Sequence, residues 1–459
     1  MTVEKKRIWG WMAFDWASQP YYTLGLTFIF GPYFASVATD YLQGGGLDAD
    51  TANAQAQSIW STGQMVAGLF IALTAPFLGA FADHSGRKIP WIAGFSIIYV
   101  VAAFALWGLL PDSSSVWLYM GIFFVGFIAA ESALNFVNAI LPSLGNDDDV
   151  GRISGSGAAF GYWGGVLSLI IILALFAEDG DTGVTRLEIA PLFGLLDPSS
   201  MEGTRAVGPF IAIWYAIFMI PFFLWVRDAP QPQKTKVNFR AIARDLGQTL
   251  RNVAKRKSLR NFLLASMFYR DAVNALYAYG GIYAKLVLGW NIGQIGVFGV
   301  IAAITAAITT WIGGKADKKF GPKPVIITAV WAMIAVSCII VGMSREAVFG
   351  VPLDPSSSLP DIIFFVCGAV IGGAGGAVYA ASRSLMVRHS HPDRPAEAFG
   401  LFALSGKATA FLAPALIGLV SWLSGNVQIG FSPVIVLFIV GLLLLRWVNK
   451  DGDRAEWSA

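Results

Sequence analysis

The chain has 459 residues, of which 56% are apolar and only 13% charged, and its formal net charge is +3. With a mean hydropathy of +0.62, it has too few polar side chains to cover a water-soluble globule of this length. The composition excludes an ordinary soluble protein and indicates an integral membrane protein.

Apolar segments of about 20 residues, the length that crosses the hydrocarbon layer as a helix, recur along almost the whole chain. Strands of a membrane barrel would alternate polar with apolar residues, whereas residues 92–110 are apolar almost throughout. We therefore predict an all-α integral membrane protein. Its twelve predicted transmembrane helices lie at residues 11–38, 58–82, 89–110, 116–142, 151–177, 207–226, 260–287, 292–312, 324–343, 361–386, 399–423 and 428–447.

The basic residues are distributed unevenly between the two sides of these helices. If the N-terminus is cytoplasmic, 26 of the 32 Lys and Arg residues fall on the inner side and three in outer loops. The positive-inside rule then predicts that both termini are cytoplasmic, in a multi-pass protein of the inner (cytoplasmic) membrane. Because topology accounts for the basic residues, the net charge indicates no nucleic-acid partner. We expect membrane lipids around a monomer.

Residues that commonly hold metals or cofactors are few. The chain has two Cys and three His, and the pair His389 and His391 lacks a third ligand at metal-binding spacing. Neither a nucleotide-binding motif nor a nucleophile with its base is apparent. We expect no metal, no cofactor and no enzyme activity.

One long inner loop divides the predicted helices six and six. We expect an N-terminal half at residues 1–226, a cytoplasmic linker at 227–259 and a C-terminal half at 260–459. Within the linker, FRAIARDLGQTLRNVAKRK has apolar residues at helical spacing among basic ones. This pattern predicts a basic amphipathic helix on the inner leaflet, with a solvated linker helix as the equal alternative.

The two halves repeat each other. GAFADHSGRK follows predicted helix two and GGKADKKFGPK follows predicted helix eight, so Asp83 and Asp317 end corresponding helices. Parallel repeats of six helices are typical of one large class of secondary transporters.

The first of these segments resembles the loop signature Gly-x-x-x-Asp-x-x-Gly-Arg-Lys of the major facilitator superfamily. Three further segments, FDWASQPYYTLGLTFIFGPYF, YRDAVNALYAYGGIYA and SRSLMVRHSHPDRPAEAFGLFALSGKATAFLAP, are similar to a bacterial family related to fungal autophagy-linked vacuolar amino-acid effluxers. The resemblance covers essentially the whole chain. It implies the major facilitator fold, with two pseudo-symmetric six-helix halves, and suggests amino acids as the substrate class.

The chain also departs from the superfamily pattern. The second loop segment has four steps from Asp317 to Gly321, whereas the first has three from Asp83 to Gly86. Predicted helix four carries Glu131 and lacks the superfamily's usual arginine motif. The glycine pattern of helix five lacks the proline of the antiporter signature, so it gives no indication of antiport.

The loop signature predicts a conformational latch. An aspartate at a helix end can bond the N-terminus of a neighbouring helix, or an arginine, in one conformational state only, while a glycine permits the tight turn that follows. The alternative is a basic loop that only sets topology. The candidate latch residues are Gly79, Asp83, Gly86, Arg87, Lys88, Asp317, Gly321 and Arg383.

Polar residues recur at helical spacing in predicted helices one, four and seven. A charge facing lipid costs at least about 2.5–3.5 kcal/mol, so we expect these faces to look at protein or water. In the facilitator fold, helices one, four, seven and ten line the central cavity. The candidate substrate and proton pathway consists of Asp15, Gln19, Tyr22, Glu131, Asn135, Asn138, Arg270, Asp271, Asn274, Tyr277 and, from helix eleven, Lys407.

Arg270 and Asp271 are neighbours within a predicted span, where charge is most costly. Adjacent residues on a helix point about 100° apart, so each must find its own partner. We expect Arg270 to pair with Glu131 or a substrate carboxylate, and Asp271 to bind an ammonium group, a proton or Lys407. Glu131 is the first candidate for coupling. A closed set of ion pairs that only joins helices is the alternative.

Together, these features predict a secondary active transporter that moves a small polar metabolite by alternating access. An amino acid or related zwitterion is the preferred substrate, and a proton the preferred coupling ion, with sodium as its alternative. The other readings are an exporter of an amphipathic solute, such as a lysolipid or drug, and a membrane receptor that kept the fold without transport.

Overall fold

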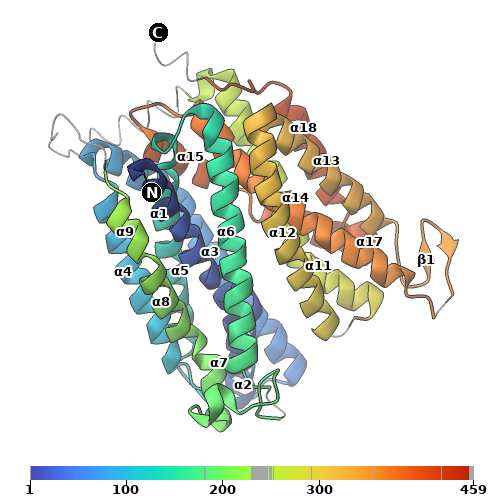
Figure 1. Ribbon diagram of the computed structural model, residues 1–459. Helices are drawn as coiled ribbons and strands as arrows, with labels where there is room; N and C mark the ends of the chain where they lie inside the picture. Colours follow the sequence, from blue (N-terminus) through green and yellow to red (C-terminus); the bar gives the residue numbers. More distant parts are fainter. Residues whose placement is uncertain are drawn as a thin grey trace. The chain divides into compact units, whose positions relative to one another are not determined.

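The computed structural model describes residues 2–179, 182–228, 247, 251, 253–290, 292–354, 356–424 and 426–453. Helices make up most of the described chain (Figure 1), as the uninterrupted apolar segments predict. The linker helix predicted around residues 239–255 falls largely outside the described residues.

The helices of the predicted N-terminal half are α1 Val3–Pro20, α2 Phe30–Gly44, α3 Ala49–Ser85, α4 Ile89–Ala105, α5 Val116–Asn138, α6 Asp147–Leu175, α7 Glu202–Arg205, α8 Val207–Phe218 and α9 Ile220–Trp225. Five short helices of other types are η1 Tyr21–Phe28, η2 Leu106–Gly108, η3 Leu141–Ser143, η4 Pro191–Gly194 and η5 Pro198–Ser200.

The later elements are α11 Lys257–Leu288, α12 Ile292–Phe320, α13 Pro322–Val341, α14 Leu359–His389, α15 Pro395–Lys407, α16 Leu412–Ser424, α17 Val427–Gly430 and α18 Pro433–Leu445. A small antiparallel hairpin, β1 Ala347–Val348 and β2 Val351–Pro352, lies between α13 and α14.

Ten helical segments of the described chain are long and apolar enough to cross a membrane. They overlap all the predicted spans except the first and the seventh. At those two places lie the broken segment α1–η1–α2 and the continuous helix α11, which carries charged residues in its middle. Length and apolar composition therefore identify ten of the twelve predicted spans. The other two predicted spans coincide with a broken helix and with a helix that carries charged residues.

The break in the first helix follows from Pro20. Proline has no amide hydrogen and its ring crowds the carbonyl four residues earlier, so the α-helical pattern cannot continue unchanged. The chain widens into the π-helix η1, and the Ile29 amide donates to Leu24 five residues back at 3.0 Å. Wide turns of this kind are frequent at functional sites.

The chain divides into two compact units that differ from the predicted halves. Unit 1 contains residues 1–71, 87–137 and 160–230, and unit 2 contains residues 72–86, 138–159 and 231–459. Two segments of the predicted N-terminal half are thus compact with the C-terminal helices. The division into two pseudo-symmetric halves stays a prediction.

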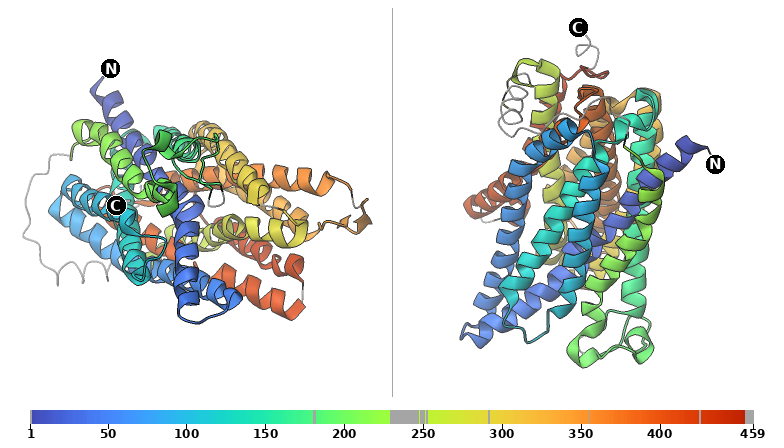
Figure 2. Two further views of the ribbon diagram at one scale, coloured as in Figure 1. Left: turned by 90° about the horizontal axis from the view of Figure 1, so that it is seen from below. Right: turned by 90° about the vertical axis from the view of Figure 1, so that its left-hand side faces the viewer.

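Unit 1 is built around α1, which contacts α8 and α9, while α4 runs beside α8 (Figure 2). Its core is aromatic, because the Tyr99 ring stacks on Tyr215 at 4.0 Å and the Tyr21 ring on Phe123 at 5.2 Å. In unit 2, α14 lies against both α12 and α13, and α11 against α18. These helices hold the polar residues of each unit in fixed positions.

Candidate functional site

In unit 1, the polar faces of helices one and four meet at Tyr22 and Glu131. Tyr22 belongs to the π-helix η1, and its hydroxyl donates a hydrogen bond to Glu131 Oε1 at 3.1 Å. Both side chains are half-buried. Asn135, one turn further along α5, is buried at 5% exposure. A carboxylate within a membrane span is therefore in contact with the irregular part of another helix.

The other two predicted residues of helix one lie against α6. A Cβ atom added to Gly161 would lie 3.1 Å from Asp15, and one added to Gly165 would lie 2.8 Å from the Gln19 side chain. Asp15 is buried and Gln19 half-buried. The glycines of helix five therefore let helix one approach closely, which gives them a packing role.

In unit 2, the predicted polar residues of α11, the predicted helix seven, contact α14, the predicted helix ten. The Tyr379 hydroxyl of α14 donates to Asn274 Oδ1 at 2.6 Å, and a Cβ atom at Gly375 would clash with the Tyr277 hydroxyl. Asn274 and Tyr277 are exposed within the span. Sequence reasoning missed Tyr379, although its spacing of four residues from Arg383 is the signal that could have found it.

The adjacent charges of helix seven have different partners. Arg270 donates from Nη1 to the Phe402 carbonyl at 3.0 Å, and its guanidinium lies 4.4 Å from the centre of the Phe402 ring. Asp271 is 2% exposed and its Oδ2 accepts the backbone amide of Ala413 at 2.9 Å. Arg270 and Glu131 fall in different units, so their pairing stays a prediction, as does that of Asp271 with Lys407.

The segment Ala72–Gly86 of unit 2 docks on the start of α15. Asp83 Oδ2 accepts the amide of Glu397 at 2.8 Å, in the first turn of α15. A Cβ atom at Gly79 would clash with the Ala396 carbonyl, and one at Gly400 would lie 2.6 Å from the Ala75 carbonyl. The carboxylate is thus placed where the helix dipole favours negative charge, and the two backbones touch through glycine.

The turns after the two signature aspartates both end in a glycine with positive φ. Gly86 and Gly321 both adopt positive φ, +67° and +85°, which non-glycine residues rarely tolerate. Beyond the first turn, Arg87 is exposed. The backbone amide of Lys88 donates to the carboxylate of Asp228 at 2.9 Å. This bond caps α4, which begins at the next residue.

Asp317, at the end of α12, faces the first turns of α6. It is 1% exposed, and a Cβ atom at Gly151 would clash with its carboxylate. Ser384 and Arg388 of α14 also lie near it. Neither carboxylate oxygen has a hydrogen bond of good geometry from the described residues.

Arg383 of α14 binds the segment Asn138–Ala159. Its Nη2 donates to the Ser154 carbonyl at 2.8 Å and its Nε to the Ser154 hydroxyl at 3.2 Å. Its Nη1 lies 3.4 Å from Asn138 Oδ1. Asn138, predicted as a pathway residue with Glu131, therefore belongs to the contacts of Arg383 in unit 2.

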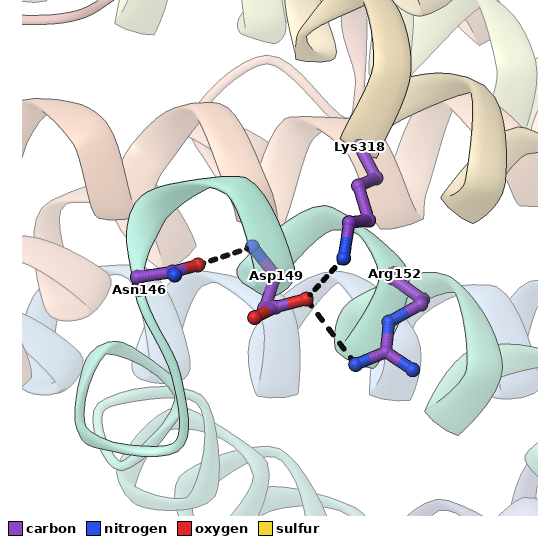
Figure 3. Close-up of polar contacts among 4 residues, drawn as sticks. All are labelled: Asn146, Asp149, Arg152 and Lys318. Atoms are coloured by element: carbon purple, nitrogen blue, oxygen red, sulfur yellow. Dashed lines mark hydrogen bonds and ion pairs between the residues drawn. The ribbon is translucent and has the colours of Figure 1, made fainter.

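An ion pair missed by sequence reasoning joins the same segment to α12 (Figure 3). Asp149 Oδ1 accepts from Lys318 Nζ at 2.8 Å and from Arg152 Nη2 at 3.2 Å. The amide of Asp149 is in turn capped by Asn146 Oδ1 at 2.9 Å. Because the sequence predicts them on the inner side of the membrane, we call the segments Ala72–Gly86 and Asn138–Ala159, with the parts of α12, α14 and α15 that they contact, the inner cluster.

Other titratable groups lie in the loop that precedes α15. Burial lowers the pKa of the His391 imidazole below its usual value, which the nearby Asp393 opposes. Among the described residues, no three His, Cys, Asp or Glu side chains gather to hold a metal ion.

Relatives of the chain are found along its whole length. A family model described as "Vacuole effluxer Atg22 like" matches residues 3–458. An uncharacterized MFS-type transporter of Bacillus subtilis, YxiO, is 24% identical over 445 residues, which cover 96% of this chain and 94% of the relative. Autophagy-related protein 22 of Cryptococcus neoformans is 23% identical over 314 residues, which cover 66% of this chain and 51% of the fungal protein. The match spans about half the length of that fungal relative.

Solved structures share the fold. The human organic anion transporter MFSD10 (TETRAN) superposes with a TM-score of 0.70 at 15% identity, covering 97% of this chain and 100% of that one. The proton:xylose symporter XylE, a major facilitator superfamily protein, gives a TM-score of 0.67 at 12% identity over 99% of this chain and 98% of its own. At these identities the likeness establishes the fold and leaves the substrate open.

Proposed function

The chain belongs to the vacuole effluxer Atg22-like family of membrane transporters with the major facilitator fold, and we propose that it is a secondary active transporter that works by alternating access. The proposed substrate is a small zwitterion, with amino acids as the first candidates, and the proposed driving force is the proton gradient.

The inner cluster is the observation that carries this proposal. It joins segments of the predicted N-terminal half to α12, α14 and α15 through hydrogen bonds, glycine contacts and a solvent-accessible ion pair. The hydrogen bonds and the ion pair are worth about 0–3 kcal/mol each. Such a set can separate and be replaced by another when the helix ends move apart, as alternating access requires.

Glu131 is the proposed proton carrier. It lies within the candidate span that contains α5 and accepts the Tyr22 hydroxyl of η1 at 3.1 Å. A protonated carboxyl accepts this bond more weakly than a carboxylate does. Proton uptake would therefore loosen the contact between α5 and the π-helical part of helix one, which links the charge to a conformational change.

Arg270 is the proposed partner of the substrate carboxylate. Its guanidinium uses Nη1 for the Phe402 carbonyl, while its Nε donates to none of the described residues. Asn274 and Tyr379 add hydrogen-bonding groups in the same unit. A guanidinium suits a substrate carboxylate and a carboxyl such as that of Glu131 suits an ammonium group, and a zwitterion carries both kinds of charge.

Uptake by proteoliposomes tests the proposal. We expect radiolabelled amino acids to accumulate when a proton gradient is imposed, and Glu131→Gln to reduce this accumulation at least about tenfold while exchange without a gradient persists. Glu4→Gln, at an exposed glutamate of the first turn of α1, is the matched control and should transport normally.

Other outcomes would replace this proposal. Accumulation driven by sodium but not by protons would change the coupling ion. Flux of lysolipids or cationic drugs without amino-acid flux would favour an exporter of amphipathic solutes. If the purified protein moves no metabolite of any class tested, the receptor interpretation gains instead.

A further inference from the structure

Helix eleven is broken in its middle, and Pro414 explains the break. Proline offers no amide hydrogen for the carbonyl of Ala410, and its ring crowds that carbonyl. The chain ends α15 at Lys407 and begins α16 at Leu412. In between, Ala410 and Leu412 donate to carbonyls only three residues back, at 3.2 and 2.7 Å.

The amides at the start of α16 can be followed one by one. Leu412 donates to Thr409, and Ala415 donates to Phe411 at 3.0 Å. Pro414 has no amide hydrogen. The remaining amide, that of Ala413, donates to the buried carboxylate of Asp271 at 2.9 Å. A side chain from helix seven therefore completes the N-terminus of α16.

The residue before this aspartate holds the other side of the break. Arg270 binds the Phe402 carbonyl, and a Cβ atom at Gly406 would clash with its guanidinium. The cation thus lies along the C-terminal part of α15, whereas the anion lies at the N-terminus of α16. Each charge has the sign that the dipole of its helix end favours. The two adjacent charges of α11 therefore stabilise the two sides of the same break.

Beyond the break, α15 is anchored at its other end by Asp83 through the Glu397 amide. If the inner cluster opens, α15 must leave α3. If α15 moves while α16 remains attached to Asp271, the bend falls between them. Bending at residues 408–411 breaks few hydrogen bonds, because Pro414 cannot donate one to the Ala410 carbonyl.

We propose that residues 408–411 are a hinge of the transport cycle, that Arg270 and Asp271 hold its two sides, and that a carboxylate ligand at Arg270 releases the α15 side. This inference rests on the proposed function. A carboxylate is a stronger acceptor for a guanidinium than a carbonyl is, so such a ligand would compete with Phe402 for Arg270.

Hydrogen–deuterium exchange of the full chain in lipid nanodiscs tests the hinge without any transport assay. We expect Asp271→Ala to speed exchange at residues 412–415 about tenfold or more, since the lost bond involves a charged group. Asp271→Asn, whose amide oxygen can still accept, should have a smaller effect. Asp228→Ala, which removes the carboxylate that caps α4, is the matched control and should leave 412–415 unchanged. Unchanged exchange in Asp271→Ala would overturn the hinge.

Pro414→Ala distinguishes a hinge from a merely structural break. Alanine restores the amide for the Ala410 carbonyl and favours helix, so we expect slower exchange at 408–413, where both proteins have amides, and a higher unfolding temperature, together with slower transport. A variant that gains stability and keeps full transport would contradict the proposal. If no substrate has been found, the exchange result alone still decides whether the segment stiffens.

The ligand arm compares a mixture of the standard amino acids with a mixture of their methyl esters. The free acids should speed exchange at 402–409, while the esters, which lack the carboxylate, should not. Equal effects of both mixtures, or of neither, would remove the carboxylate from the proposal. Loss of transport with an intact ligand effect would instead count against the proposed function.

Discussion

Asp83 and Asp317 end corresponding helices of the internal repeat, yet they are held differently. Asp83 is half-buried and accepts a short hydrogen bond from the first turn of α15. Asp317 is almost completely buried against Gly151 in the first turns of α6, and neither of its oxygens has a well-formed hydrogen bond from the described residues. Both carboxylates face a helix N-terminus, but only the first is bonded to it.

The extra residue in the second loop accounts for part of this difference. The Gly86 amide approaches the Asp83 carbonyl three residues back at 3.3 Å, whereas the Gly321 amide donates to the Asp317 carbonyl four residues back at 2.7 Å. The helix α12 thus keeps a full α-helical turn after its aspartate, while α3 ends in a tighter one. We infer that a hydrogen bond holds the first contact and that packing holds the second.

The largest effect is expected at Gly79, where a side chain would meet the backbone of α15. Because Gly79→Ala forces Cβ against the Ala396 carbonyl, it should destabilise the docked state by about 1–3 kcal/mol. In a protein whose two native cysteines are alanine, a cysteine placed at the buried Ala396 should be labelled by a maleimide several-fold to a hundredfold faster.

The matched control for this prediction is Gly94→Ala, since a Cβ atom there would have open space. It should leave the labelling rate unchanged. Equal labelling in Gly79→Ala and the parent protein would mean that α3 and α15 are not closely docked.

The next effect separates the two aspartates directly. Asp83→Ala removes a hydrogen bond to a charged acceptor, worth about 1.5–3 kcal/mol, so the same labelling should accelerate at least about tenfold. Asp317→Asn keeps the side-chain volume and loses no well-formed bond, so it should change the rate less than about threefold. Equal effects of both variants would show that the two contacts are equivalent latches.

A smaller effect is expected at Gly151, where a new methyl group meets a side chain instead of backbone. Gly151→Ala should lower stability by about 1 kcal/mol, since Asp317 can move aside at some cost. In thermal unfolding, the double variant Gly151→Ala with Asp317→Ala should recover most of the loss, because the two sites are in contact. Strictly additive effects would contradict the contact between α6 and α12.

The smallest effect should come from the ion pair of Figure 3. Lys318 and Asp149 are 47% and 28% exposed, and ion pairs with solvent access contribute only about 0–1 kcal/mol. Lys318→Ala should therefore accelerate Ala396-cysteine labelling less than about fivefold, and high salt should reduce the difference further. An effect larger than that of Asp83→Ala would reverse the proposed ranking of contacts.

The helix interruptions could be anticipated from the sequence only in part. Pro20 and Pro414 both mark places where the α-helical pattern must yield. Proline alone does not determine the outcome, since the chain widens into η1 after Pro20 but forms tight turns before Pro414. The neighbours also differ, since Glu131 bonds the Tyr22 side chain of η1 whereas Asp271 bonds a backbone amide of α16.

The polar residues were identified as unusual by their cost in a membrane, but their partners were not. Helical spacing groups Asn138 with Glu131, whereas the Asn138 side chain contacts Arg383 in unit 2. Tyr379 and Asp149 were overlooked because a single tyrosine in a span and an aspartate beside a basic loop are common features. Spacing places residues on one face of a helix, yet it does not specify what that face meets.

The sequence by itself determined that the chain is helical and membrane-embedded, predicted where most helices cross, and identified the glycine turns after Asp83 and Asp317. These properties depend on local chain length, hydropathy and backbone sterics, which act within about 20 residues. Only the tertiary structure decided that Asp83 meets the start of α15, that Asp317 is buried on α6, and that Arg270 and Asp271 hold the two sides of a broken helix. Such pairings join residues more than a hundred positions apart, and they depend on which helices pack together.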